Sequence, residues 1–269
     1  MPMFRVVNYD SGLCSNITCV AHVITQLKPA ETFDVLWTRR PIGFTYGMPG
    51  DKNVWDRFFE PIVCDDGIEP TLVTHHSWRL PPVTTPTPAN SYASSRGHRV
   101  FRLPRWRQGY HKAWSAWMHP LPHIVQRAES FAEQFRSRRV VAVHFRNPRE
   151  HSAEDFQGQS VQIDDYIAAA EAEEGDLFFV ATDDPVAHDY MKKRWRQRML
   201  SQDVTRDLRG VHRVNKDNGI LIGEEVLSDV LLLAKCDVLV HRNSNIVLVA
   251  CFVNPSLKLK TLFHGTLAT

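Results

Sequence analysis

The second half of the chain contains three short, almost wholly apolar runs, and each run ends in a group of polar side chains. The runs cover residues 139–145, 176–182 and 237–242. Apolar runs of this length predict strands that are covered on both faces, as in a parallel sheet. Segments with helical spacing lie around them, so the pattern predicts an open α/β sheet. The expected helices cover residues 122–136, 163–174, 185–200, 223–236 and 244–255.

The N-terminal end of the chain begins with the same pattern. A strand is expected at residues 4–9, followed by a glycine turn and by a helix over 17–31, and a second strand is expected at 32–38. Strand, glycine turn and helix form the opening unit of an open α/β sheet. Residues 39–110 show no clean period. The Pro-, Ser- and Thr-rich part at 81–97 fits either a linker or an ordered loop on the substrate side.

Composition and charge exclude several classes of protein. The chain has 269 residues, is 43% hydrophobic and carries a net charge of +2, which is typical of a folded globular protein and gives no field for nucleic acid. No apolar run reaches the roughly 18 residues of a membrane span, and the N-terminus shows no secretory signal. The five cysteines have no metal-ligand spacing. We therefore expect a cytoplasmic protein with no metal site, no nucleic-acid partner and no membrane span.

The polar groups at the strand ends predict a ligand site. In an open parallel sheet the ligand lies beyond the carboxyl ends of the strands. Arg146 follows the first apolar run, and its planar guanidinium suits the oxygens of a phosphate. Ser244 and Asn245 open the helix after the third run, where backbone N–H groups and the helix dipole suit an anion. Each feature also has an ordinary explanation, because a strand-end arginine can be solvated and Asp184 can simply cap a helix.

Three segments of the second half together resemble a known family. Residues 140–151 (VVAVHFRNPREH), 177–193 (LFFVATDDPVAHDYMKK) and 227–247 (LSDVLLLAKCDVLVHRNSNIV) are similar to three successive motifs of the α1,6-fucosyltransferase superfamily. This superfamily includes core fucosyltransferases, bacterial nodulation fucosyltransferases and protein O-fucosyltransferases. Residues 7–17 and 53–62 show a weaker resemblance to the N-terminal half of such enzymes.

The resemblance implies a fold, a donor and a reaction. The fold would be GT-B-like, with two Rossmann-type domains whose parallel sheets face a cleft. Residues 1–125 would form the acceptor-side domain and residues 126–269 the nucleotide-sugar domain. The resemblance implies an inverting transfer of L-fucose from GDP-fucose to a glycan hydroxyl, without a metal or another cofactor.

The resemblance also implies roles for individual residues. Arg146 would bind the β-phosphate and stabilise the departing GDP, and Glu154 would be the general base, with Glu150 and Asp183 as alternatives. Gly12 to Asn16 would face the acceptor. The implied donor-site residues are His144 near the guanine, Asp229 reading the guanine, Ser244 and Asn245 at the phosphates, and Tyr166, Asp183 and Asp184 at other donor positions.

One departure from the family keeps other functions open. Arg149 stands where the first motif of the family has an aspartate. A different donor such as UDP-xylose, or a relative that binds nucleotides or glycans without turnover, is therefore an alternative. Trp106, Trp114 and Trp117, with the histidines near them, fit either an acceptor platform or the core. The basic segment at 191–200 fits a solvated helix face better than a nucleic-acid-binding surface.

Overall fold

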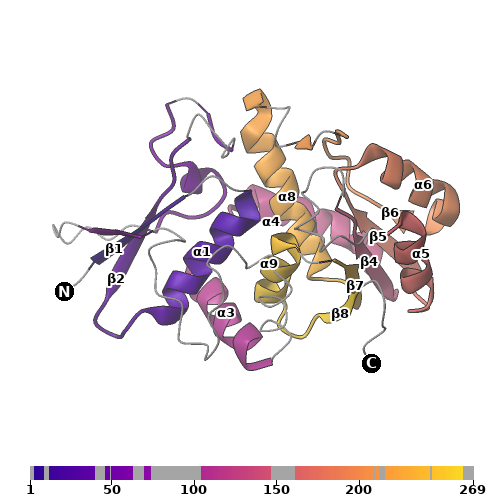
Figure 1. Ribbon diagram of the computed structural model, residues 1–269, viewed down its shortest axis with the longest axis horizontal. Coiled ribbons are helices and arrows are strands. Elements are labelled where there is room, and N and C mark those ends of the chain that lie inside the picture. Colours follow the sequence, from indigo (N-terminus) through magenta and orange to yellow (C-terminus); the bar gives the residue numbers. More distant parts are fainter. Residues whose placement is uncertain are drawn as a thin grey trace.

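The protein is an α/β structure built on two parallel sheets. In the described part of the computed structural model, one sheet has three strands in the order β2-β1-β3 and the other has five in the order β6-β5-β4-β7-β8. Figure 1 shows the two sheets toward opposite ends of the molecule, with several helices packed between them. The structure describes residues 3–8, 12–39, 46–48, 50–62, 70–73, 104–146, 161–208, 210–211, 216–242 and 244–262.

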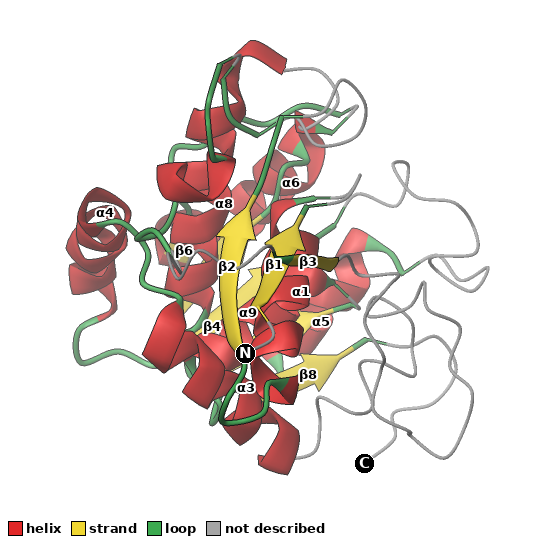
Figure 2. Ribbon diagram, turned by 90° about the vertical axis from the view of Figure 1, so that its left-hand side faces the viewer, coloured by secondary structure: helices red, strands yellow, loops and turns green. Residues whose placement is uncertain are grey.

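The smaller sheet is formed by the N-terminal end of the chain. Strand β1 (Met3–Val7) pairs in parallel with β2 (Thr32–Leu36) and with β3 (Thr71–Val73). Figure 2 shows these three strands side by side. Helix α1 (Leu13–Gln26) begins within the expected glycine turn, four residues earlier than the sequence predicted. The two predicted strands and the helix are confirmed, whereas β3 was not predicted.

The larger sheet has the strand order of a doubly wound nucleotide-binding fold. From β4 (Val140–His144) the chain adds β5 (Leu177–Ala181) on one side, returns to add β7 (Val238–His241) on the other, and every neighbouring pair is parallel. The order therefore reverses between β4 and β7, and a crevice forms at such a point, beyond the carboxyl ends of the strands. The two edge strands are β6 (Met199–Leu200) and β8 (Lys258–Thr261).

Both faces of the larger sheet are covered, which explains its apolar strands. All five residues of β4 are buried. Val141 and Val143 belong to the apolar cluster that contains Tyr166 and Trp195, whereas Val140 and Ala142 belong to the cluster on the opposite face. The helices of this part of the chain are α3 (Pro104–Trp117), α4 (Pro122–Ala132), α5 (Ile163–Glu171), α6 (Pro185–Trp195), α8 (Gly219–Leu233) and α9 (Asn245–Val253).

Helix α9 joins the two halves of the molecule. It is apolar around its whole circumference and contacts α1, α3 and α8, as expected for a helix that is buried on all sides. Tyr110 of α3 stacks on Phe252 of α9, with 4.8 Å between ring centroids. Buried side chains of both sheets belong to one continuous cluster. The domain division expected at residue 125/126 falls within α4 and stays a prediction.

Two parts of the predicted secondary structure need correction. The expected helix over 185–200 ends at Trp195, because Arg196 adopts a φ of 50°, and residues 199–200 join the sheet as β6. Helix α3 was not predicted, although Tyr110, Ala113 and Trp114, which it buries, have helical spacing; its arginines and Gly109 hid this period. The expected loop at 81–97 lies outside the described residues. Within the described part of the chain, no helix combines the length and the apolar character needed to cross a membrane.

The close packing of α8 gives a stability prediction. A Cβ atom at Gly223 would lie 2.3 Å from Cε1 and 2.4 Å from Cζ of Phe58, whose side chain is fully buried. We expect Gly223→Ala to lower the free energy of unfolding by about 1 to 3 kcal/mol, because the enclosed ring has little room to move. Urea unfolding measures this change.

Gly109 is the matched control. It lies inside α3, and a Cβ atom there would meet nothing within 4 Å. Gly109→Ala should be neutral or stabilising by up to about 1 kcal/mol, because alanine is the better helix former. Equal stability of Gly223→Ala and the wild type would contradict the packing described here.

Candidate functional site

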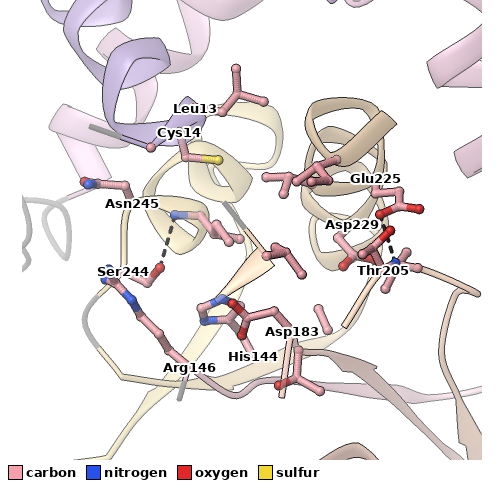
Figure 3. A pocket seen from close by; sticks show the side chains of 18 of the residues that line it. Leu13, Cys14, His144, Arg146, Asp183, Thr205, Glu225, Asp229, Ser244 and Asn245 are labelled. Carbon is pink, nitrogen blue, oxygen red and sulfur yellow. Dashed lines mark hydrogen bonds between the residues drawn. The ribbon is translucent and has the colours of Figure 1, made fainter. Parts of the chain in front are cut away.

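A cavity of about 190 Å³ lies at the point where the strand order reverses. Its walls come from the carboxyl ends of β4 and β5, the N-termini of α1 and α9, and one face of α8. Polar side chains that are far apart in the sequence therefore meet at one edge of the sheet (Figure 3). Of the predicted site residues, those that line the cavity are Gly12, His144, Arg146, Asp183, Asp229, Ser244 and Asn245.

One end of the cavity is positively charged. Figure 3 shows the Arg146 side chain next to Ser244, with Asn245 above it at the start of α9. The Ser244 hydroxyl accepts a hydrogen bond of 3.3 Å from the backbone N–H of Ile246 and so caps this helix. The buried Oδ1 of Asn245 has no hydrogen-bond partner among the described residues. A guanidinium beside a helix N-terminus is a suitable site for an anion.

His144 lies beside this end as the last residue of β4. The residue is 5% exposed, and its Nδ1 has no hydrogen-bond partner in the described part of the protein. Burial, together with the nearby charges of Arg146 and His241, lowers the pKa of His144 to about 3. The imidazole is therefore neutral at physiological pH and can offer a ligand one donor or one acceptor.

The other end of the cavity is acidic. Glu225 and Asp229 lie one helical turn apart on α8 and point to the same side, toward Thr205 (Figure 3). The backbone N–H of Thr205 donates to Oε2 of Glu225 at 3.0 Å, and Nε2 of Gln202 donates to Oδ1 of Asp229 at 2.6 Å. This end therefore carries two carboxylates, each held by one hydrogen bond.

Burial controls the charge of Asp229. It raises the pKa of this carboxyl to about 7, against the hydrogen bond from Gln202 and the charges of Arg206 and Arg127, which lower it. Asp229 is half-buried in the wall of the cavity, where the surrounding protein limits the water that can solvate its negative charge. A ligand that donates hydrogen bonds here would replace that missing solvation.

Asp183 lines the cavity between the two ends. Burial raises the pKa of its carboxyl, whereas a backbone hydrogen bond and the charge of Arg146 lower it. A carboxylate with a raised pKa next to a cationic site is a candidate proton acceptor.

Three other predicted site residues do not line the cavity. The Asp184 carboxylate caps α6, accepting hydrogen bonds of 2.8 Å and 3.0 Å from two backbone N–H groups. Tyr166 is buried on the face of the larger sheet that α5 and α6 cover, where its ring packs against Phe145. The Asn16 amide donates to the carbonyl of Gly12 at 3.2 Å, which supports the first turn of α1.

The N-terminal half forms the wall opposite the sheet. Tyr46 and Cys14 line the cavity together with Gly12. Burial raises the pKa of Tyr46 above its ordinary value and that of Cys14 to about 12, so both groups are neutral. No sequence pattern pointed to Tyr46, which lies in a segment without a clear period. Glu225 could have been found, because it precedes Asp229 by one helical turn.

Several other predicted groups lie away from the cavity. Trp114 is buried in the core, and Trp106 and Trp117 do not line the cavity either. Glu154, Glu150 and Arg149 lie outside the described residues. No group of three or more His, Cys, Asp or Glu side chains in the described ranges could hold a metal ion.

Known structures share this fold, although no family model and no curated protein matches the sequence. The fucosyltransferase NodZ from Bradyrhizobium is 15% identical with a TM-score of 0.57, covering 93% of this chain and 92% of that chain. A NodZ α1,6-fucosyltransferase soaked with GDP-fucose is 14% identical with a TM-score of 0.58, over 94% and 93% of the two chains. A point mutant of Arabidopsis thaliana FUT1 in complex with GDP is 14% identical with a TM-score of 0.50, over 99% of this chain and 71% of that chain. The chain thus has the α/β, GT-B-like fold of these fucosyltransferases, and the predicted resemblance is confirmed for the fold.

The half-buried carboxyl of Asp229 gives a pH-dependent stability prediction. Its pKa is about 7 in the folded protein and about 4 in an unfolded chain. The folded state therefore loses stability as the pH rises from about 4 to about 7, and the loss is complete above that range. Asp229→Asn removes the ionisation, so it should match the wild type near pH 4 and exceed it by roughly 2 to 4 kcal/mol near pH 8. Thermal unfolding across this range measures the difference.

Asp217 supplies the control for this prediction, because it is exposed. Asp217→Asn should show no such gain at high pH. A variant Asp229→Asn that is less stable than the wild type at every pH would contradict the account of burial.

Proposed function

We propose that the protein is a glycosyltransferase that moves a sugar, L-fucose from GDP-fucose in our preferred scheme, to a hydroxyl of a glycan. The observation that carries this proposal is a single cavity with a cation at one end and two carboxylates at the other. A nucleoside diphosphate sugar has the matching chemistry, with a dianionic diphosphate and a base that can donate hydrogen bonds. The shared fold supports GDP-fucose in particular, since a NodZ structure of this fold was soaked with that donor.

The cationic end would bind the diphosphate. The Arg146 guanidinium can donate two parallel hydrogen bonds to phosphate oxygens. The N-terminus of α9 adds backbone N–H groups and the positive end of the helix dipole. His144 is neutral and can donate one more hydrogen bond without changing the net charge of the site.

The acidic end would bind the base. Guanine presents two adjacent N–H donors, one on the ring and one on its exocyclic amino group, and the carboxylates of Glu225 and Asp229 are acceptors. Uracil presents a single N–H between two carbonyl oxygens, which would lie against the carboxylates and be repelled. The acidic end therefore favours a guanine nucleotide over a uridine nucleotide.

The transfer itself would be a direct displacement at the anomeric carbon. The acceptor oxygen forms a bond to this carbon from the face opposite the diphosphate, while the bond to the β-phosphate oxygen breaks and its electron pair stays with GDP. Attack from the opposite face inverts the anomeric configuration. Arg146 and α9 stabilise the negative charge that develops on the leaving group, so the scheme calls on no metal ion.

The proton of the acceptor hydroxyl needs a base. Asp183 is one candidate, because burial raises its pKa and makes it a stronger base than an exposed aspartate, but this role requires the sugar of the donor to lie toward the middle of the cavity. Glu154 remains the other candidate in our scheme. Asp183→Asn and Glu154→Gln separate the two, because the base is the residue whose loss lowers kcat while donor binding persists.

Arg146→Ala tests the proposed role of the guanidinium. We expect kcat to fall by about 10²- to 10³-fold, because the variant loses a donor that stabilises the developing charge. Single-turnover kinetics with GDP-fucose and a glycan acceptor measure the chemical step. Arg194→Ala is the control, since Arg194 pairs with Glu171 on an exposed surface away from the cavity, and it should keep full activity. Turnover of Arg146→Ala near the wild-type rate would refute the assignment.

A thermal-shift series tests the donor. GDP and GDP-fucose should raise the melting temperature more than UDP and UDP-xylose at equal concentration, because the ligand with the lower Kd stabilises the folded state more. A ligand at about 100 times its Kd contributes about 2.7 kcal/mol. A larger shift with UDP-xylose would reassign the donor. GDP-fucose binding without any release of GDP, with or without acceptors, would mark a binding protein that lacks turnover.

A further inference from the structure

The buried amide of Gln202 lies behind the acidic end of the cavity. Gln202 follows β6 and is 4% exposed. Its Oε1 accepts a hydrogen bond of 2.8 Å from the Ser228 hydroxyl, and its Nε2 donates to Oδ1 of Asp229 at 2.6 Å. Ser228 is fully buried and directly precedes Asp229 on α8. The Ser228 hydroxyl thus fixes which side of the amide faces the carboxylate.

The backbone of Gln202 is held as well. One N–H group of the Arg206 guanidinium donates to the carbonyl of Gln202 at 2.8 Å, and another donates to the carbonyl of Val204. The Arg206 guanidinium therefore holds the backbone around Gln202, while the Gln202 side chain is hydrogen-bonded to Ser228 and Asp229 of α8. A side chain held at both ends can fix the orientation of its neighbour.

This arrangement divides the two oxygens of Asp229 between two tasks. Oδ1 is occupied by the amide of Gln202. Oδ2 has no hydrogen-bond partner in the described part of the protein, although Asp229 lines the cavity. Gln202 itself does not line the cavity, so a ligand would meet the carboxylate and not the amide.

We propose that Gln202 is a positioning residue for base recognition, which ties one oxygen of Asp229 to the protein and presents the other to the N–H edge of a purine. This inference rests on the proposed function, because it takes the base to be guanine. Gln202 acts through Asp229, so its loss should change the protonation of that carboxylate and, through it, the affinity for GDP.

The charges around Asp229 give the direction of this change. Burial raises its pKa, and among the opposing effects the hydrogen bond from Gln202 is the largest, ahead of the charges of Arg206 and Arg127. Glu225 faces the same carboxylate from α8 and raises its pKa. A variant without the amide donor should therefore keep Asp229 protonated to a higher pH, where the wild type is already ionised.

Gln202→Met tests the inference, because methionine keeps the length of the side chain and removes the donor. The GDP affinity of the wild type should fall as the pH drops through about 7. In Gln202→Met this fall should move up by about one pH unit, so that affinity at pH 7 drops about five- to tenfold while affinity near pH 9 stays within about threefold of the wild type. Isothermal titration calorimetry with GDP over this pH range measures the profile.

A second measurement needs no nucleotide. The pKa of Asp229 can be followed by carboxyl ¹³C NMR of the free protein, with the resonance assigned by its loss in Asp229→Asn. It should move upward in Gln202→Met and, by a smaller amount, in Ser228→Ala, which removes only the hydroxyl that orients the amide. Ser228→Ala carries the test should Gln202→Met fail to fold. Gln134→Met is the control, because the exposed Gln134 amide donates to a backbone carbonyl away from the cavity.

The outcomes separate this inference from the proposed function. An unchanged Asp229 titration in a folded Gln202→Met that binds GDP as the wild type does would overturn the inference alone. An equal loss of GDP affinity at every pH would also overturn it, since that pattern indicates general damage to the fold. A wild type that binds no GDP at any pH would overturn the proposed function and the inference together.

Discussion

Burial of β4 on both of its faces is the constraint on which the larger sheet and its site depend. Valines and an alanine fill this strand because helices cover both sides, and a side chain of β4 can reach a ligand only near the carboxyl end. The return of the chain from β6 to β7 leaves a crevice at that same end. Strand burial and strand order together therefore bring His144 and Arg146 next to the start of α9.

Sequence periodicity correctly predicted the strands and the polar residues that directly follow them, because both depend on neighbouring residues only. The apolar runs located β4, β5 and β7, and the polar residues after them located Arg146 and Ser244, because a strand and the turn behind it are contiguous. Strands β6 and β8 were missed, since one has two residues and the other alternates with lysines as an exposed edge does. Tyr46 and Thr205 were missed because tertiary packing brings them to the cavity from segments with no motif of their own.

The resemblance was a better guide to the sheet edge than to individual side chains. Asp184 follows Asp183 directly, yet one carboxylate caps α6 while the other lines the cavity. A polar residue after a strand serves the helix or the ligand according to the direction of its side chain, and that direction depends on a single turn of backbone. Sequence alone can locate such a turn but cannot separate the two roles.

Helix α8 meets both halves of the molecule. Gly223 lies against Phe58 of the N-terminal half, and less than two turns later the same helix carries Asp229. A bulkier residue at the glycine would press on Phe58 and Tyr46, and Tyr46 lines the same cavity as Glu225 and Asp229, so the change would reach the acidic end. Substitutions around Phe58 and substitutions in the acidic end are thus expected to accumulate as matched pairs, with Tyr46 as the residue between them.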